Sequence, residues 1–122
     1  MTAEDIVQAH KFPDSICRGS YPIDIHNSAG EGTIIIPPPP GDYYEIPYRC
    51  LIPLRVENLL IGCGCILATH EAHAAIRIIP IIMGVGQAVG AAAVLCIRYR
   101  TSPREIDPSL LRETLRSQGA IL

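Results

Sequence analysis

The chain has 122 residues, of which 48% are hydrophobic and 18% are charged. A chain of this length forms one domain with a modest core, and this composition argues against intrinsic disorder. The formal net charge is −2 and the basic residues are scattered, which argues against a nucleic-acid-binding protein, since such proteins present a basic surface.

The first residues and the cysteines both indicate a reducing compartment. Residues 1–5 are polar and acidic, without the basic start and apolar core of a signal peptide. The five cysteines are an odd number, which does not suit a disulfide framework. We therefore expect a cytoplasmic protein with free thiols.

Short elements are predicted in the first third of the chain. Thr2 is a suitable cap for a short helix with acidic residues in its first turn. Residues 21–26 have extended character, and the three isoleucines at 34–36 favour a strand. The four prolines at 37–40 end this strand because proline has no amide hydrogen to donate.

Two further strands and a helix are predicted in the middle of the chain. Residues 44–51 have the composition of a strand, although Pro47 indicates an edge or a break. Residues 58–61 are a short, mainly apolar run that ends at Gly62, which is typical of a buried strand. Residues 68–77 have helical composition.

Capping signals are clearest at the end of the chain. Ser102 and Glu105 form a capping box, with Pro103 at the first helical position. Asp107 repeats the cap for a helix rich in leucine, and Gly119 is well placed to end that helix.

Residues 78–97 form an apolar stretch that is long enough to span a membrane. Pro80 interrupts this stretch near its start and leaves about 17 residues of helix, rich in alanine and glycine, which insert weakly into membranes. A membrane anchor is therefore an alternative and not the main expectation.

The same stretch has two further interpretations. Gly84 and Gly86 have the spacing of a dinucleotide-binding fingerprint, but residues 101–108 contain no second strand to hold a ribose-binding acid. A buried helix that starts near Met83 would instead present free amide hydrogens to an anionic group. In the simplest form of that interpretation, the glycines only allow close packing.

A series of short motifs occurs along nearly the whole chain. They lie at residues 12–14, 21–26, 46–53, 56–61, 68–73, 76–77, 83–90 and 102–120. This ordered series resembles the C-terminal segment of FAD-dependent oxidoreductases. The resemblance implies an α+β fold with short strands or hairpins, one long buried apolar helix and a short C-terminal helix, incomplete relative to the full flavoprotein fold.

The resemblance also implies how the chain is organised. Residues 1–57 would be a substrate-side segment of short strands and loops, and residues 58–122 the C-terminal part of the FAD-binding domain, within one compact unit. The Gly-x-Gly-x-x-Gly unit that binds the ADP moiety in this family is not present before residue 58. We therefore expect a missing N-terminal half, with FAD not fully held and no catalysis by this chain alone.

A flavin-ring site is implied by the same resemblance. A glycine-rich turn would follow the strand at 58–61 beneath the FAD, and the helix near Met83 would point its amino end at the ring. The implied cofactor-binding residues are Gly62, Gly64, Met83, Gly84, Gly86 and Gln87. Where the family tends to have Gly-Arg-Cys, this chain has Cys63-Gly64-Cys65, so a guanidinium for phosphate or substrate is lost.

His70, His73 and Arg77 can share one face of a helix. They are the candidate catalytic residues, as a patch that binds a carboxylate or moves a proton beside the flavin. The alternative is a pair of structural histidines beside a surface arginine. Cys63 and Cys65 together with the histidines also suggest zinc, but C-x-C and H-x-x-H are tighter than zinc spacings, so no metal is expected.

The sequence thus predicts the C-terminal portion of an FAD-dependent oxidoreductase that contributes the flavin-ring side of the cofactor site. The alternatives are a non-enzymatic oligomerisation or interaction module and a membrane-anchored protein. Without a partner domain the apolar stretch at 78–97 would be exposed, so we expect the N-terminal half or self-association as a homo-oligomer. Neither nucleic acid nor a membrane is an expected partner.

Overall fold

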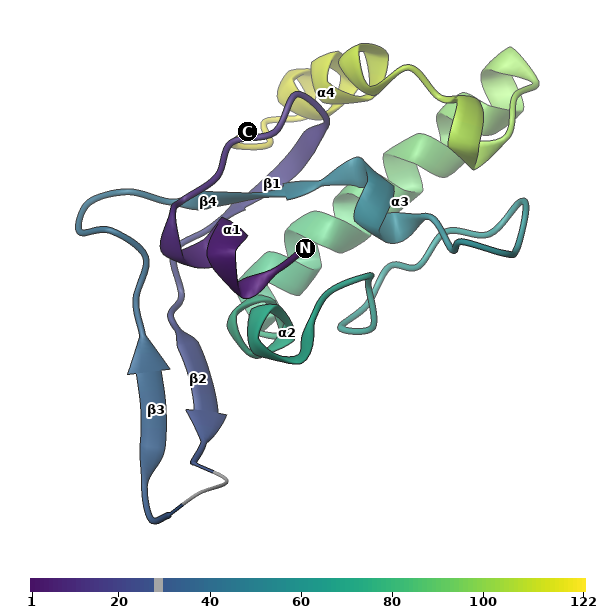
Figure 1. The fold of residues 1–122 in the computed structure, drawn as a ribbon. Coiled ribbons are helices and arrows are strands. Elements are labelled where there is room, and N and C mark those ends of the chain that lie inside the picture. The colour runs from purple at the N-terminus through teal and green to yellow at the C-terminus, as the bar shows by residue number, and fades with distance from the viewer. Residues whose placement is uncertain (28–29) are drawn as a thin grey trace.

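The computed structural model describes residues 1–27 and 30–122 (Figure 1). In chain order the elements are α1 (Ala3–Val7), β1 (Ser15–Gly19), β2 (Ile23–His26), β3 (Thr33–Ile36), β4 (Tyr44–Pro47), η1 (Tyr48–Leu51), α2 (His70–Ile76), α3 (Ile79–Tyr99), η2 (Pro103–Glu105) and α4 (Pro108–Ser117). The described residues form a small α+β fold with short antiparallel strands, one long helix and a short C-terminal helix, as predicted.

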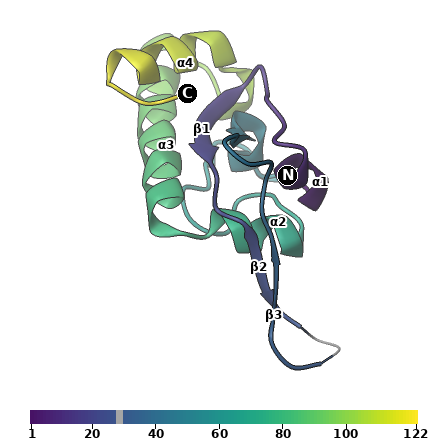
Figure 2. The same ribbon diagram turned by 90° about the vertical axis from the view of Figure 1, so that its left-hand side faces the viewer.

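Two antiparallel strand pairs have different surroundings. β1 pairs with β4, with Cys17 opposite Ile46, and all of β4 is buried. β2 pairs with β3, with Ile25 opposite Ile34, and all of β3 is exposed. Figures 1 and 2 show that the β2–β3 hairpin extends away from the rest of the molecule. The body of the fold is therefore built on β1 and β4.

The long helix α3 is central to the packing. It contacts β1 and α4, while α2 contacts β2 and α1. Val85 and Leu95 on its inner face are buried in the same apolar cluster as Leu111 of α4. Residues 1–57 and 58–122 both contribute to this cluster, and the expected boundary between them stays a prediction.

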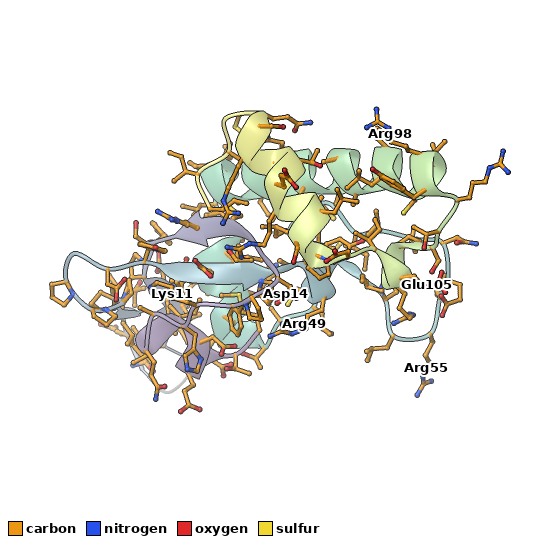
Figure 3. All side chains as sticks on the ribbon, turned by 90° about the horizontal axis from the view of Figure 1, so that it is seen from above. Lys11, Asp14, Arg49, Arg55, Arg98 and Glu105 are labelled. Carbon is orange, nitrogen blue, oxygen red and sulfur yellow. The ribbon has the colours of Figure 1, made fainter. Side chains whose placement is uncertain are left out.

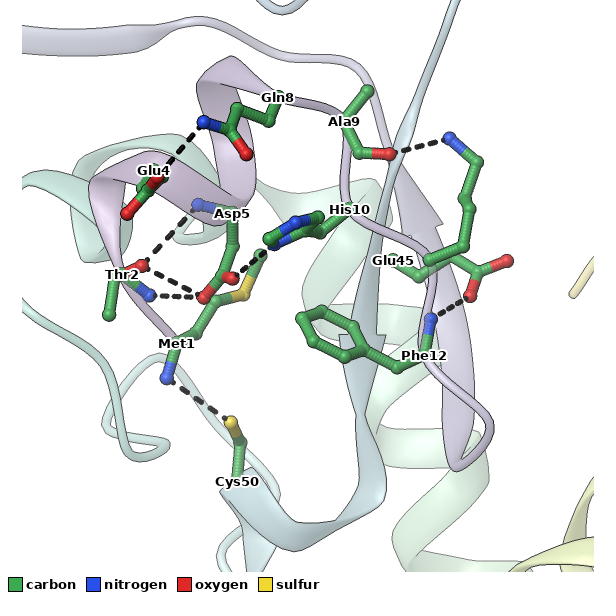
Figure 4. A network of polar contacts seen from close by, with 11 residues as sticks. Met1, Thr2, Glu4, Asp5, Gln8, Ala9, His10, Phe12, Glu45 and Cys50 are labelled. Carbon is green, nitrogen blue, oxygen red and sulfur yellow. Dashed lines mark hydrogen bonds and ion pairs between the residues drawn. The ribbon is translucent and has the colours of Figure 1, made fainter.

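The start of the chain is fixed by hydrogen bonds (Figure 4). Thr2 caps α1 and forms a capping box with Asp5, whose carboxylate accepts the backbone N–H of Thr2 at 2.7 Å. The amino group of Met1 contacts the Cys50 sulfur at 3.6 Å and donates to the Leu67 carbonyl at 3.0 Å. The predicted cap is confirmed, and Met1 is attached to the segment that leads into α2.

The predicted caps near the end of the chain are also present. Ser102 and Glu105 form a capping box, although on the short 3₁₀ turn η2. The carboxylate of Asp107 accepts the N–H of Ser109 at 2.8 Å at the start of α4. Gly119 follows α4 with a φ of 84°, a conformation that glycine adopts without a steric penalty.

The expected strand at residues 58–61 is wrong. The described backbone bond of this segment runs from the N–H of Ile61 to the carbonyl of Leu51 at 2.9 Å. Asn58 has a left-handed φ of 54°, which is incompatible with an extended strand. A strand needs a partner backbone along its whole length, and within the described residues neither strand pair extends to this segment.

Two prolines set element boundaries that differ from those expected. The strand expected over residues 44–51 ends at Pro47, and the 3₁₀ turn η1 follows. Pro80 is within the first turn of α3, which starts at Ile79 and not near Met83. Proline is tolerated there because amide hydrogens of the first turn have no helical partner. The helix therefore has 21 residues and is longer than expected.

By length and composition, α3 could cross a membrane. About a third (33%) of its apolar window is buried within the fold. A single helix of this kind is weak evidence, because core helices of soluble proteins have the same length and composition. The membrane-anchored alternative stays a prediction.

Candidate functional site

The three candidate catalytic residues lie together on α2 and at its carboxyl end. Thr69 caps this helix, and the helical spacing places His70, His73 and Arg77 on one side of it. With part of β2 they line an open cavity of about 340 Å³. The lining residues are Asp24, Ile25, His26, His70, His73, Ala74 and Arg77. The structure brings the three residues together, and their catalytic role stays a prediction.

Arg77 and Asp24 bring opposite charges to this cavity. No ion pair involves the exposed Arg77 guanidinium in the described part of the chain. The hydroxyl of Tyr21 donates to Oδ2 of Asp24 at 3.1 Å. This hydrogen bond raises the pKa of Tyr21, and the positive charge of Arg77 partly opposes the rise. Asp24 is thus engaged with Tyr21, whereas Arg77 is available to an anionic ligand.

The two histidines of α2 are not equivalent. Nε2 of His73 is in hydrogen-bonding contact with the carbonyl oxygen of Gly64. A carbonyl can only accept, so this nitrogen carries the proton. His70 is exposed, and none of the described residues hydrogen-bonds its ring. Of the two histidines of α2, His70 is therefore the one whose ring is free to exchange a proton with a ligand, while His73 holds the turn at Gly64.

Asp24 and His26, which belong to the β2 wall of the cavity, were not predicted as site residues. Their spacing of two residues places them on the same face of a strand, so the sequence could have indicated that these two side chains lie together. The alternation does not specify which helix that face will meet. The contact of β2 with α2 arises from tertiary packing and has no local signature.

Three of the predicted cofactor-binding glycines lie at one side of α3, with Gly86 on the helix and Gly62 and Gly64 on the turn that packs against it. A Cβ atom on Gly62 would lie 3.2 Å from Cγ2 of Val89, so the turn presses directly on the helix. A Cβ on Gly64 would lie 4.0 Å from Cδ1 of Ile82. Gly86 is located between Ile82 and Val89 along the helix, and a Cβ there would meet nothing within 4 Å. This side of α3 is thus contacted by the turn and open at Gly86.

The other three predicted cofactor residues point elsewhere. A Cβ on Gly84 would lie 2.7 Å from the Cys17 sulfur, so this glycine allows α3 to pack closely on β1. The Gln87 amide donates to Gln118 at 3.3 Å, and the Met83 side chain is 70% exposed. The six residues are not gathered at one point, and their role in binding stays a prediction.

Asp14 is a buried carboxylate whose partners belong to the fold and not to the cavity (Figure 3). The Arg49 guanidinium pairs with it, and the backbone N–H of Arg49 donates to it at 3.2 Å. The same guanidinium lies 4.8 Å from the centre of the Phe12 ring. The neighbouring Tyr48 hydroxyl donates to the Pro103 carbonyl at 2.8 Å. These contacts hold the segment before β1, η1 and η2 together.

No group of three histidine, cysteine or acidic side chains among the described residues is arranged to hold a metal ion. The sulfur atoms of Cys63 and Cys65 are 2.7 Å apart on the turn. His70 and His73 line the cavity on α2. The His73 ring contacts this turn through the Gly64 carbonyl, but the residues considered as zinc ligands do not form a metal-binding group within the described chain.

A model of the FAD dependent oxidoreductase family matches residues 1–115. The chain belongs to this family. No curated protein and no solved structure gives a significant match. Family membership makes this a domain related to flavin-dependent oxidoreductases and implies FAD as the cofactor.

The residues of α3 fit the isoalloxazine ring of FAD, which is flat and has a polar edge that accepts hydrogen bonds. The side of the helix at Gly86 is open to a flat group. The first turn has no side-chain cap, so its amide hydrogens are available as donors. The accessible donor belongs to Ile79, since Pro80 has no amide hydrogen and Ile81 is buried in the core. Because α3 starts at Ile79, the free amide hydrogens of its first turn lie before residues 83–86, where they were expected.

Proposed function

We propose that this chain contributes the flavin-ring side of an FAD site, and that the cavity between β2 and α2 receives the substrate. The direct connection between two helices carries the proposal. Arg77 ends α2 and lines the cavity, and Ile78 caps α3, whose first turn follows at once. A ring held by the amino end of α3 would therefore lie beside the cavity.

Arg77 and His70 are the groups of the helix wall that would act on a substrate in this cavity, with Asp24 and His26 on the β2 wall. The unpaired Arg77 guanidinium would bind an anionic group of the substrate, such as a carboxylate, by charge-assisted hydrogen bonds. His70 would exchange a proton with the substrate, since its imidazole ring is exposed to solvent and has no hydrogen-bond partner among the described residues. FAD, when bound, supplies the hydride acceptor. The part of this chain is orientation and proton control.

The ADP moiety of FAD would be bound by a separate nucleotide-binding half. The sequence has no Gly-x-Gly-x-x-Gly strand–helix unit ahead of residue 58. The residues on α3 can hold the ring edge, but they provide no recognised pyrophosphate cradle. We therefore expect weak FAD binding and no turnover by this chain alone.

Titration with FAD, followed by flavin absorbance and fluorescence, tests the proposal. The purified chain should bind weakly, and a mixture with a separately encoded nucleotide-binding half from the same genome should bind more tightly. Tight FAD binding with turnover by the isolated chain would refute the expectation that this chain is inactive alone. No binding in the mixture would refute the flavin-ring site.

Gly86→Leu should weaken FAD binding by the mixture about tenfold, because filling a well-fitted space costs on the order of 1–3 kcal/mol. Gly90→Leu is the matched control, since Gly90 is equally open but lies one turn farther from the amino end of α3, where the ring edge is proposed to bind. Fluorescence titration of the two variants measures the difference. Equal affinities would show that the open side at Gly86 does not hold the ring.

A non-enzymatic interaction module is the second candidate function. It is favoured by the large apolar side chains that α3 exposes. They include Ile79, Met83, Val94 and Ile97, with exposed fractions of 75%, 70%, 58% and 80%. A module of this kind would associate through α3 without binding FAD, so the flavin titration separates the two candidates.

A further inference from the structure

A turn with two exposed cysteines lies between η1 and α2. Cys63 and Cys65 flank Gly64, and both side chains face solvent. Before the turn, the N–H of Ile61 donates to a carbonyl of η1 at 2.9 Å, and after it the N–H of Leu67 does the same at 2.9 Å. Both ends of the turn are therefore fixed to the body of the fold.

The middle of the turn is fixed as well. Nε2 of His73 donates to the carbonyl oxygen of Gly64, the residue between the two cysteines. His73 belongs to α2, whose neighbouring residues Ala72 and Ala75 are fully buried. The turn is thus held at three points, and the two cysteines have little freedom to separate.

The two sulfur atoms lie side by side as thiols. Their separation of 2.7 Å is short for a contact between two thiols and longer than the disulfide bond length of about 2.05 Å. The hydrogen bond between them lowers the pKa of Cys63 and raises that of Cys65. Burial raises the pKa of Cys17 to about 11 and also raises the pKa values of Cys50 and Cys96. One thiol of the exposed pair therefore ionises before the three thiols whose pKa values burial raises.

We propose that Cys63 and Cys65 are a redox-active dithiol, which closes reversibly to a disulfide by exchange with a small-molecule disulfide such as oxidised glutathione. Thiol–disulfide exchange requires an accessible thiolate and a second sulfur within reach, and the turn provides both. The turn includes Gly64, one of the predicted cofactor-binding residues, but the exchange itself does not require bound FAD.

The exchange takes place in two steps. The Cys63 thiolate attacks one sulfur of the small disulfide, whose S–S bond breaks as a mixed disulfide forms and one small thiolate leaves with a proton. Cys65 then loses its proton and attacks the Cys63 sulfur, which releases the second small thiol. In total the protein loses two electrons and two protons, and the small disulfide is reduced to two thiols.

The resulting disulfide is expected to be labile and not structural. Cys63 and Cys65 are separated by one residue, so the bond would remove little entropy from the unfolded chain. Exposed disulfides of this kind are reduced more easily than buried ones. Oxidation should therefore leave the unfolding midpoint in urea nearly unchanged and should reverse in reduced glutathione.

Equilibration of the purified chain in glutathione buffers of increasing oxidised fraction tests the proposal. After acid quenching and alkylation, Cys63 and Cys65 should lose their free thiols together, and the unalkylated chain should become lighter by two hydrogen atoms. Peptide mapping should place the link between these two cysteines. A stable glutathione adduct on Cys63, or disulfide-linked dimers in place of the internal link, would overturn the proposal.

Single substitutions separate the two steps. Cys65→Ser should accumulate a glutathione adduct on Cys63, because no second thiol can displace it. Cys96→Ser is the control from elsewhere in the chain, and it should form the internal link at the same glutathione ratio as the unmodified protein. Formation of the adduct to the same extent in all three proteins would contradict the two-step exchange.

His73 is a positioning residue for this dithiol, and its substitution has a redox readout. His73→Leu should shift the glutathione ratio at half-oxidation severalfold, because the Gly64 carbonyl loses its donor. His73→Gln keeps an N–H donor and should restore the ratio, and His70→Leu should leave it unchanged. Identical ratios for His73→Leu and the unmodified protein would remove His73 from the proposal.

Discussion

The guanidinium of Arg77 is the exposed cation of the cavity and has no ion-pair partner among the described residues. Arg77→Leu should weaken binding of a dicarboxylate probe, succinate, about tenfold or more, since a charged hydrogen bond contributes about 1.5–3 kcal/mol. Shifts of the His70 ring signals during an NMR titration measure the affinity. Arg98→Leu is the matched control, because Arg98 is exposed beside a different hollow near α4 (Figure 3). An equal loss in both variants would contradict the assignment.

Asp5 gives a pH-dependent contribution to stability. Partial burial tends to raise its pKa, but hydrogen bonds from His10 and Thr2 outweigh burial and hold the pKa below the ordinary value of 3.8. A carboxyl group whose pKa is lowered in the folded state stabilises the fold at pH values above its ordinary, unfolded-state pKa. This stabilisation is lost as the pH falls through the lowered pKa of the folded state.

Asp5→Asn should therefore cost about 1 kcal/mol near neutral pH, the usual scale for a helix cap, and little near pH 2. Urea unfolding at both pH values measures the difference in free energy of unfolding. Glu113→Gln, at an exposed position of α4, serves as the control and should change little at either pH. A cost for Asp5→Asn that does not depend on pH would contradict this account.

The glycines of α3 have different roles along the helix. A Cβ on Gly84 would lie 2.7 Å from the Cys17 sulfur of β1, so Gly84→Ala should destabilise the fold by about 1–3 kcal/mol. Gly90→Ala meets no neighbour within 4 Å and should stabilise the helix by about 0.5–1 kcal/mol. Thermal unfolding of both variants provides the comparison. Equal shifts in the two midpoints would argue against the close contact of α3 with β1.

Elements with local signals were predictable from the sequence, and elements that depend on distant partners were not. The caps at Thr2 and Asp107 are confirmed because donor and acceptor lie within three residues of each other. Residues 58–61 have the composition of a strand, but composition does not reveal that no partner strand lies beside them. Pro80 was expected to interrupt the long helix, whereas its place in the first turn makes it part of the helix.

The same distinction applies to the candidate site. The grouping of His70 with Arg77 follows from helical spacing alone. The approach of Asp24 and of the turn at Gly64 depends on how β2 and the segment before α2 pack against the helices. No periodicity in a single sequence encodes that packing.

The molecule as a whole presents an apolar face along α3 that its own core does not cover. Large exposed apolar faces favour association, so we expect a concentration-dependent homo-oligomer by light scattering at micromolar concentration. The double variant Met83→Glu/Ile97→Glu, at positions that are 70% and 80% exposed, should shift the protein to monomer. Leu54→Glu, at a 74% exposed position outside α3, is the control and should not.

A monomer at all concentrations would contradict self-association through α3. The membrane-anchored alternative gives a different result, since a chain anchored by α3 would be extracted only with detergent. Fractionation of cells with and without detergent distinguishes the two.

The two walls of the cavity differ in stiffness. Asp24 and His26 belong to a two-stranded ribbon whose outer strand, β3, is exposed along its length, and β2 packs against the body of the fold at α2. His70 and Arg77, in contrast, are spaced by helix geometry. The distance between Asp24 and Arg77 can therefore adjust to the length of a ligand that bridges them. The distance between His70 and Arg77 is set by the helix, so a ligand that binds both must match it.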